Sequence, residues 1–194
     1  AALLAATLAG CTGNAPKERT LTAQIDGAAG KTLYFDKFVN NRPVHADSVK
    51  LDAEGNGMMK LPAMPLDFYS LTLGGDQIMV LLLDSAESIR VTAQADSLQF
   101  PRKVEGSVNT ALLHGYFRDA KTYDDQSQAL AQRLKADPAD SSAMVEYAKL
   151  NADFGQQTRQ FIQDHMRSPA VLAALNRINP QQDLPLFQQV KDSL

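Results

Sequence analysis

Hydrophobic and polar positions follow two different periods along this chain, and the change falls near Gly106. Before it, apolar residues alternate with polar ones in short segments separated by Gly, Pro, Asn and Asp, a pattern typical of β-strands. After it, apolar residues recur with a helical period over long stretches. We therefore predict an α+β chain, with a β domain over 21–106 and a helical region over 107–194.

The first part predicts a run of short strands. The expected strands are 21–25, 33–38, 44–51, 58–61, 68–73, 78–83, 89–94 and 100–104. The segment 78–83 is continuously apolar, which predicts a strand buried on both faces. The run Asp52–Gly57 predicts a hairpin turn with Gly and Asn in the left-handed backbone region. Short strands at this spacing favour an antiparallel β-sandwich or a partly open barrel.

The second part predicts a long antiparallel helix pair followed by short helices. Apolar residues at helical spacing run over 112–134 and again over 144–165. Between these stretches, Asp137-Pro138 predicts an N-cap followed by proline at the first helical position. Ser168-Pro169 predicts the same start for a third helix, and Asp183 is placed to cap a last one.

The charge balance argues against a nucleic-acid partner. The 194 residues carry 19 Lys and Arg against 22 Asp and Glu, a net charge of −3, and show no basic patch or arm. The chain has one cysteine, so it contains no disulfide framework, no Cys-x-x-Cys pair and no zinc pattern. We therefore expect no cofactor in this chain.

The side chains that could carry chemistry are scattered. The segment Asp52–Gly57 superficially resembles the start of a calcium loop, but Ala63 stands where a bidentate Glu is needed. His45, His114 and His165 each lack a second ligand at metal spacing, so we expect no metal site. Core filling is the expected use, rather than an adaptable binding surface, for Met58, Met59, Met64 and Met79. We identify no catalytic residue from these patterns.

The single cysteine, Cys11, follows Leu8-Ala9-Gly10 at the end of an apolar stretch. A branched apolar residue, two small residues and a cysteine resemble a bacterial lipobox, in which the cysteine becomes the lipid attachment site. The stretch is too short to span a bilayer, which takes about 20 apolar residues. We predict a signal peptide remnant and lipobox over 1–11 and a flexible tether over 12–20. The alternative is a free thiol on Cys11.

Several segments in order resemble a known family. They are Val44–Gly55, Ile78–Asp84, Glu87–Ala93, Val104–Asn109 and Phe161–Leu175. Behind a lipobox, they resemble the domain of unknown function that precedes TlpA/ResA-like thioredoxin domains in lipoproteins of Bacteroidetes-type bacteria. The resemblance covers nearly the whole chain after the cysteine. It implies a sandwich and a helical linker that lead to a thioredoxin-like domain in cis, which exchanges thiols and disulfides.

The resemblance implies an accessory role for this chain. No catalytic residue can be carried over, because the Cys-x-x-Cys motif is absent. We expect the non-catalytic region of a lipid-anchored thiol-disulfide oxidoreductase, which provides anchoring, docking and binding of protein clients. The acidic run that often directs such lipoproteins to the cell surface is replaced by Thr12–Ala15, so we expect a periplasm-facing anchor in the outer membrane. The alternative is a free-standing periplasmic lipoprotein that binds a ligand or protein without redox chemistry, and an independent enzyme ranks last.

Overall fold

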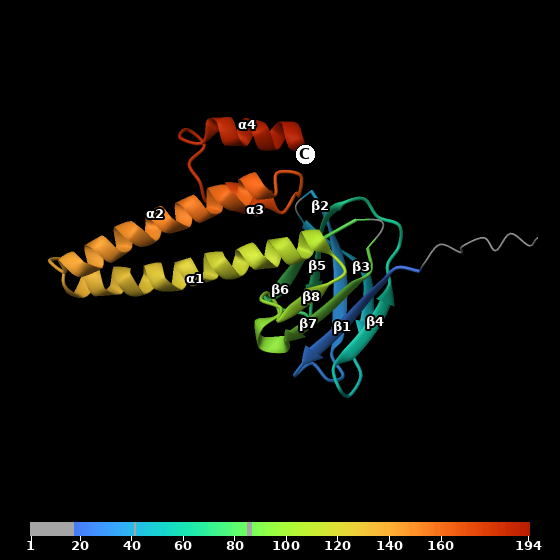
Figure 1. The fold of residues 1–194 in the computed structure, drawn as a ribbon. Coiled ribbons are helices and arrows are strands. Elements are labelled where there is room, and N and C mark those ends of the chain that lie inside the picture. Colours follow the sequence, from blue (N-terminus) through green and yellow to red (C-terminus); the bar gives the residue numbers. More distant parts are fainter. Residues whose placement is uncertain (1–17, 41, 85–86) are drawn as a thin grey trace, which may run out of the picture.

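Two four-stranded β-sheets form the first part of the protein in the computed structural model, which describes residues 18–40, 42–84 and 87–194 (Figure 1). The strands are β1 (Thr20–Asp26), β2 (Thr32–Val39), β3 (Arg42–Lys50), β4 (Asn56–Lys60), β5 (Asp67–Thr72), β6 (Ile78–Leu83), β7 (Ile89–Gln94) and β8 (Lys103–Glu105). One sheet has the order β4-β1-β7-β8 and the other β3-β2-β5-β6. Neighbouring strands are antiparallel except β1 and β7, which are parallel.

The two sheets face each other and bury one core between them. Alternate residues of each strand point inward, so Leu21 and Ile25 of one sheet share this core with Leu33 and Leu71 of the other. The sheets share no strand and are not closed into a barrel. The α+β class is therefore confirmed, and the described strands form two sheets and not a barrel. The prediction that all strands are antiparallel is wrong for β1 and β7.

The turn at Asp52–Gly57 is not a hairpin, contrary to the prediction from the sequence. β3 pairs with β2, whereas β4 pairs with β1, so this turn carries the chain from one sheet to the other. Gly55 has a φ of +80°, and a Cβ there would lie 2.2 Å from the carbonyl oxygen of Ile25. Asn56 does not take the left-handed conformation but begins β4, where it lies opposite Gln24.

Helices follow the sheets: α1 (Val108–Ala136), α2 (Ser141–Asp164), α3 (Val171–Leu175) and α4 (Leu184–Ser193). The predicted helix starts at Asp137-Pro138 and Ser168-Pro169 are wrong, because α2 begins at Ser141 and α3 begins at Val171 with Ala170 at the N-cap position. Asp137 closes α1, where its N–H bonds to the carbonyl of Arg133, and Asp140 caps α2 by accepting from the amide of Ala143 at 2.9 Å. Asp183 occupies the N-cap position of α4, but its carboxylate bonds to Arg159 instead of a backbone amide.

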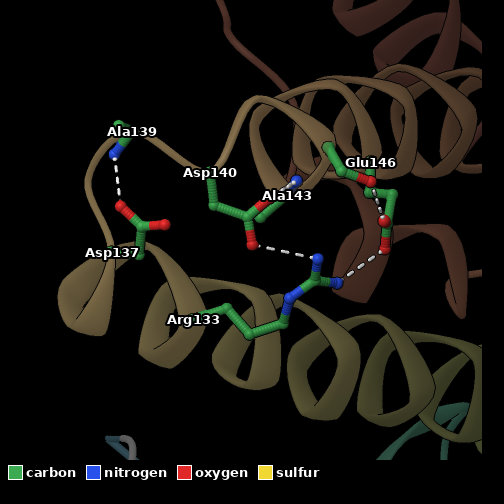
Figure 2. A network of polar contacts seen from close by, with 7 residues as sticks. Arg133, Asp137, Ala139, Asp140, Ala143 and Glu146 are labelled. Atoms are coloured by element: carbon green, nitrogen blue, oxygen red, sulfur yellow. Dashed lines mark hydrogen bonds and ion pairs between the residues drawn. The ribbon is translucent and has the colours of Figure 1, made fainter.

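α1 and α2, here called the helical arm, lie side by side and extend away from the sheets (Figure 1). Tyr123 of α1 stacks on Phe154 of α2 at 4.1 Å between ring centroids. At the far end, Figure 2 shows Arg133 bonded to both Asp140 and Glu146. No helix in the described ranges combines the length and the apolar character needed to cross a membrane.

Candidate functional site

The helical arm joins the sandwich where α1 runs along β6, the last strand of its sheet. The prediction that this strand is buried on both faces is confirmed for its second half only, because Ile78 is exposed and Val80 is half-buried. Met79 and Leu81 point into the sandwich core, and Leu82 packs on the other side against Leu113 and Ala170. An edge strand normally exposes unpaired main-chain groups, so the way in which α1 covers them determines what remains accessible.

A buried polar cluster fixes the start of α1 to this edge. The hydroxyl of Thr110 accepts from the N–H of Leu82 at 3.0 Å and donates to the carbonyl of the same residue at 2.9 Å. Ser107, the N-cap of α1, accepts from the amide of Thr110 at 3.2 Å and lies 3.0 Å from the carboxylate of Glu87. Ser107 is 2% exposed, so its hydroxyl is not reachable as a nucleophile from solvent.

His114 continues this contact one helical turn later. Its Nε2 lies 2.8 Å from the carbonyl oxygen of Val80, which makes Nε2 the protonated nitrogen, while the buried Nδ1 has no partner. Burial lowers the pKa of His114, the bond to Val80 opposes this, and the charge of Arg118 lowers it further. The neutral imidazole is therefore the form that fits the junction, and the ring also packs edge-on against Phe117 at 5.7 Å.

Beyond His114, the strand and the helix enclose a crevice of about 450 Å³. Its apolar lining consists of Ile78, Val80, Phe100, Phe117 and Ala120, and its polar lining of Gln99, Lys121, Asp124, Asp125 and Arg177. This volume is within the range of small-molecule and peptide pockets. The crevice is open to a binding partner.

The charged residues at this crevice neutralise one another. Arg177 donates to both carboxylate oxygens of Asp124, at 2.8 and 2.9 Å, and this contact lowers the pKa of Asp124 and raises that of Arg177. Lys121 bonds to Asp125 at 2.7 Å, and its ammonium group lies 5.8 Å from the centroid of the Phe100 ring. The arrangement therefore suits a neutral occupant better than an ion.

The residues singled out from the sequence lie apart from one another. Cys11 is outside the described residues. His45 lies on β3 near Asp36 at 3.4 Å, His165 ends α2 against Phe161, and only His114 reaches the junction. Within the ranges that the structure describes, no group of three His, Cys, Asp or Glu side chains could hold a metal ion.

The acidic turn and the methionines have structural environments. Asp52 accepts from the amides of Asn56 and Glu54, at 2.7 and 3.0 Å, and the bond from Asn56 is the main cause of its lowered pKa. Three of the four methionines fill the sandwich core as predicted: Met59, Met64 and Met79. The prediction is wrong for Met58, which is 61% exposed because it points outward from the edge strand β4.

Ser107, Thr110 and Glu87 form the junction, yet sequence reasoning did not single them out. A serine just before a helical pattern is a local N-cap signal, so Ser107 could have been found as a cap. No local signal indicates that Thr110 meets Leu82, which lies 28 residues away in the chain. Comparisons with known protein families, curated proteins and solved structures found no match.

Proposed function

We propose that this chain is the anchoring and docking region of a lipid-anchored thiol-disulfide oxidoreductase of the cell envelope. In this proposal Cys11 carries the lipid, residues 12–20 are the tether, and a thioredoxin-like domain in cis performs the chemistry. One line of support is the lipobox at Cys11, followed in order by the sequence segments that resemble the TlpA/ResA-associated domain. The observation that carries the proposal is the polar junction between Thr110 and β6, which attaches a long helical arm to a sandwich in a fixed direction.

The helical arm extends from the sandwich along α1 and returns along α2 (Figure 1). α1 has 29 residues, which corresponds to a length of about 44 Å at 1.5 Å per residue. We propose that α1 and α2 act as an antiparallel pair, because the ion pairs of Arg133 join them at the start of α2 and the stacking of Tyr123 on Phe154 joins them at its middle. Since α2 returns along α1, α4 packs against the first half of α1, near the sandwich (Figure 1), and a domain that followed α4 would be held close to clients bound at the sandwich.

The crevice beside the junction supports the docking part of the proposal. It lies between the sandwich and the arm, where one partner touches both elements. The aromatic rings of Phe100 and Phe117 offer apolar contact, and the neighbouring charges are already paired. A client that bound there would be held close to a domain carried by the arm.

Membrane attachment is tested on the natural gene product, made with its own leader in a bacterium that has an outer membrane. Cells are fed an alkyne-labelled fatty acid, and labelled protein is followed through membrane fractionation. We expect label and outer-membrane association for the wild type and for a Thr12→Ala control, and neither for Cys11→Ala. Unlabelled, soluble wild-type protein would overturn the anchor.

Redox partnership is tested on the same purified product by its ability to reduce the disulfides of insulin. The proposal predicts exchange by the natural product and none by a version ending at Leu194. A labelled lipoprotein without exchange activity would favour the alternative, a free-standing periplasmic lipoprotein that binds a ligand or protein at the crevice.

A further inference from the structure

We propose that the open stretch of the β6 edge, beside the crevice, binds an extended peptide segment as an added strand. This inference specifies how the proposed docking region would bind its client. It rests on the proposed function for the identity of the partner, which is an unfolded or extended client chain. It stands on three features of the described residues: the direction of the β6 main chain, the point at which α1 stops covering it, and the chemistry of the crevice.

The direction of the β6 main chain follows from its pairing with β5. Thr110 bonds to both main-chain groups of Leu82, so those groups point away from β5. In an antiparallel pair, successive residues alternate between facing the partner strand and facing away from it. Val80 and Ile78 have the same parity as Leu82, so their N–H and C=O groups also point to the outer edge.

Coverage by α1 ends before it reaches Ile78. Thr110 covers Leu82, and His114 covers the carbonyl of Val80. Further along the same helix face, Phe117 has no polar atom on its side chain and Lys121 bonds to Asp125. At the other end, the Gln77 side chain accepts from the amide of Leu98 at 3.1 Å and so ties the strand to the next loop. The main chain of the edge is therefore covered at the Leu82 end, and Gln77 ties the other end to the segment after β7.

Ile78 lies between the part of the edge that α1 covers and the Gln77 contact. It is 39% exposed and lines the crevice together with Phe100 and Phe117. An occupant of this opening meets main-chain donors and acceptors on one side and aromatic rings on the other. An extended peptide matches both, because its backbone pairs with the strand edge and alternate side chains enter apolar space.

Charge argues for the same occupant. The ion pairs Arg177–Asp124 and Lys121–Asp125 leave the crevice without excess charge. An anionic headgroup or phosphate would have to displace a carboxylate that is already bound, whereas a neutral peptide backbone displaces neither. The crevice therefore favours a segment of polypeptide over a charged small ligand.

The opposite edge of the same sheet is less suited to this pairing. β3 carries Pro43, and its pairing with β2 shifts register between Phe35 and Asp36. Proline and bulges are devices that keep edge strands from pairing with other chains. We therefore expect an added strand at β6 and not at β3.

The experiment uses the 15N-labelled chain and a probe peptide, acetyl-Val-Thr-Val-Thr-Val-amide, followed by amide chemical shifts. We expect the shifts to move at Ile78 and Val80 and around Phe100 and Phe117. A copy of the peptide with every backbone amide N-methylated lacks the main-chain donors, and we expect it to bind about tenfold more weakly or worse. Shifts at β3, or equal binding of both peptides, would overturn the proposal.

The matched variants are Ile78→Pro and Ile78→Val. Proline removes the outward N–H at the first residue of an edge strand, where it is tolerated, and valine keeps the N–H and the β-branched shape. We expect Ile78→Pro to lose the peptide and Ile78→Val to keep it, with unchanged amide signals in β1 and β7 as evidence of folding. Equal binding by the two variants would contradict strand addition. Neither lipid nor a redox domain takes part, so failure here leaves the tests of the proposed function intact.

Discussion

Thr110 bonds to both main-chain groups of Leu82, accepting from the N–H at 3.0 Å and donating to the carbonyl at 2.9 Å. A helix side chain thus takes the place that a neighbouring strand would occupy at the edge of the sheet. Both residues are fully buried, so water cannot replace these bonds. Thr110 is the side chain that satisfies the N–H of Leu82, whereas the carbonyl also accepts from the hydroxyl of Ser107 at 3.1 Å, so the first of these bonds can be tested by removing one hydroxyl group.

Thr110→Val keeps the shape of the side chain and removes the hydroxyl. The N–H of Leu82 then has no partner in a buried site, and we expect the free energy of unfolding to fall by about 1–3 kcal/mol. Urea denaturation measures this. Thr110→Ser keeps the hydroxyl and serves as the control, with a smaller loss. A valine variant as stable as the wild type would show that the bond contributes little.

The stability of the protein should fall in mild acid because of His114. Burial lowers its pKa in the folded state, so below about pH 6.5 the unfolded chain takes up a proton that the folded protein does not. This contribution is complete above that pH and is lost as the pH falls toward the folded-state pKa, at up to about 1.4 kcal/mol per pH unit.

The pH dependence is measured by urea denaturation at several pH values between about 7.5 and 5.5, a range that spans the ordinary histidine pKa. His114→Gln can still donate to Val80 and has no titrating group, so we expect a flatter profile. Identical profiles for wild type and His114→Gln would refute the assignment.

Gly106 links β8 to α1 and cannot be replaced without strain. Its φ is +85°, and a Cβ there would lie 2.0 Å from the carbonyl oxygen of Ser88. We expect Gly106→Ala to cost at least about 1 kcal/mol, measured by thermal or urea denaturation. Gly115→Ala is the control, because it lies inside α1 with no atom within 4 Å of the added carbon. That variant should gain up to about 1 kcal/mol, and a loss of equal size in both would contradict the reasoning.

Arg159 fastens α4 to the arm. Its Nε and Nη2 donate to the two carboxylate oxygens of Asp183 at 2.7 and 3.0 Å. Lysine cannot make this paired contact, so we expect Arg159→Lys to speed hydrogen exchange in α4 and leave the sheets unchanged. Arg133→Lys, at the far end of the arm, should leave α4 exchange as it is. Unchanged exchange in Arg159→Lys would show that apolar packing alone holds the helix.

The strands could be predicted because alternation is a local property. The patterns over Leu21–Ile25 and Ile78–Leu83 identified β1 and β6, and the continuous apolar run correctly indicated two buried faces in the second half of β6 but not at Ile78. Pairing is not local. The residues Asp52–Gly57 signal a chain reversal, but they do not specify that β4 pairs with β1 and not with β3.

The residues of the candidate site were harder to predict from the sequence than the strands. His114 is an isolated histidine in the chain, and its partner Val80 lies 34 residues away. Asp137 and Asp140 both suit an N-cap, and only the length of α1 decides between them. Cys11 is a feature of sequence alone, and its lipid remains a prediction.

Reading the gene past the codon for Leu194 tests the central claim most directly. The account predicts an open frame that continues into a thioredoxin-like domain with a Cys-x-x-Cys motif. A stop codon directly after Leu194 would contradict the redox assignment, and the protein would then be studied as a free-standing binding lipoprotein.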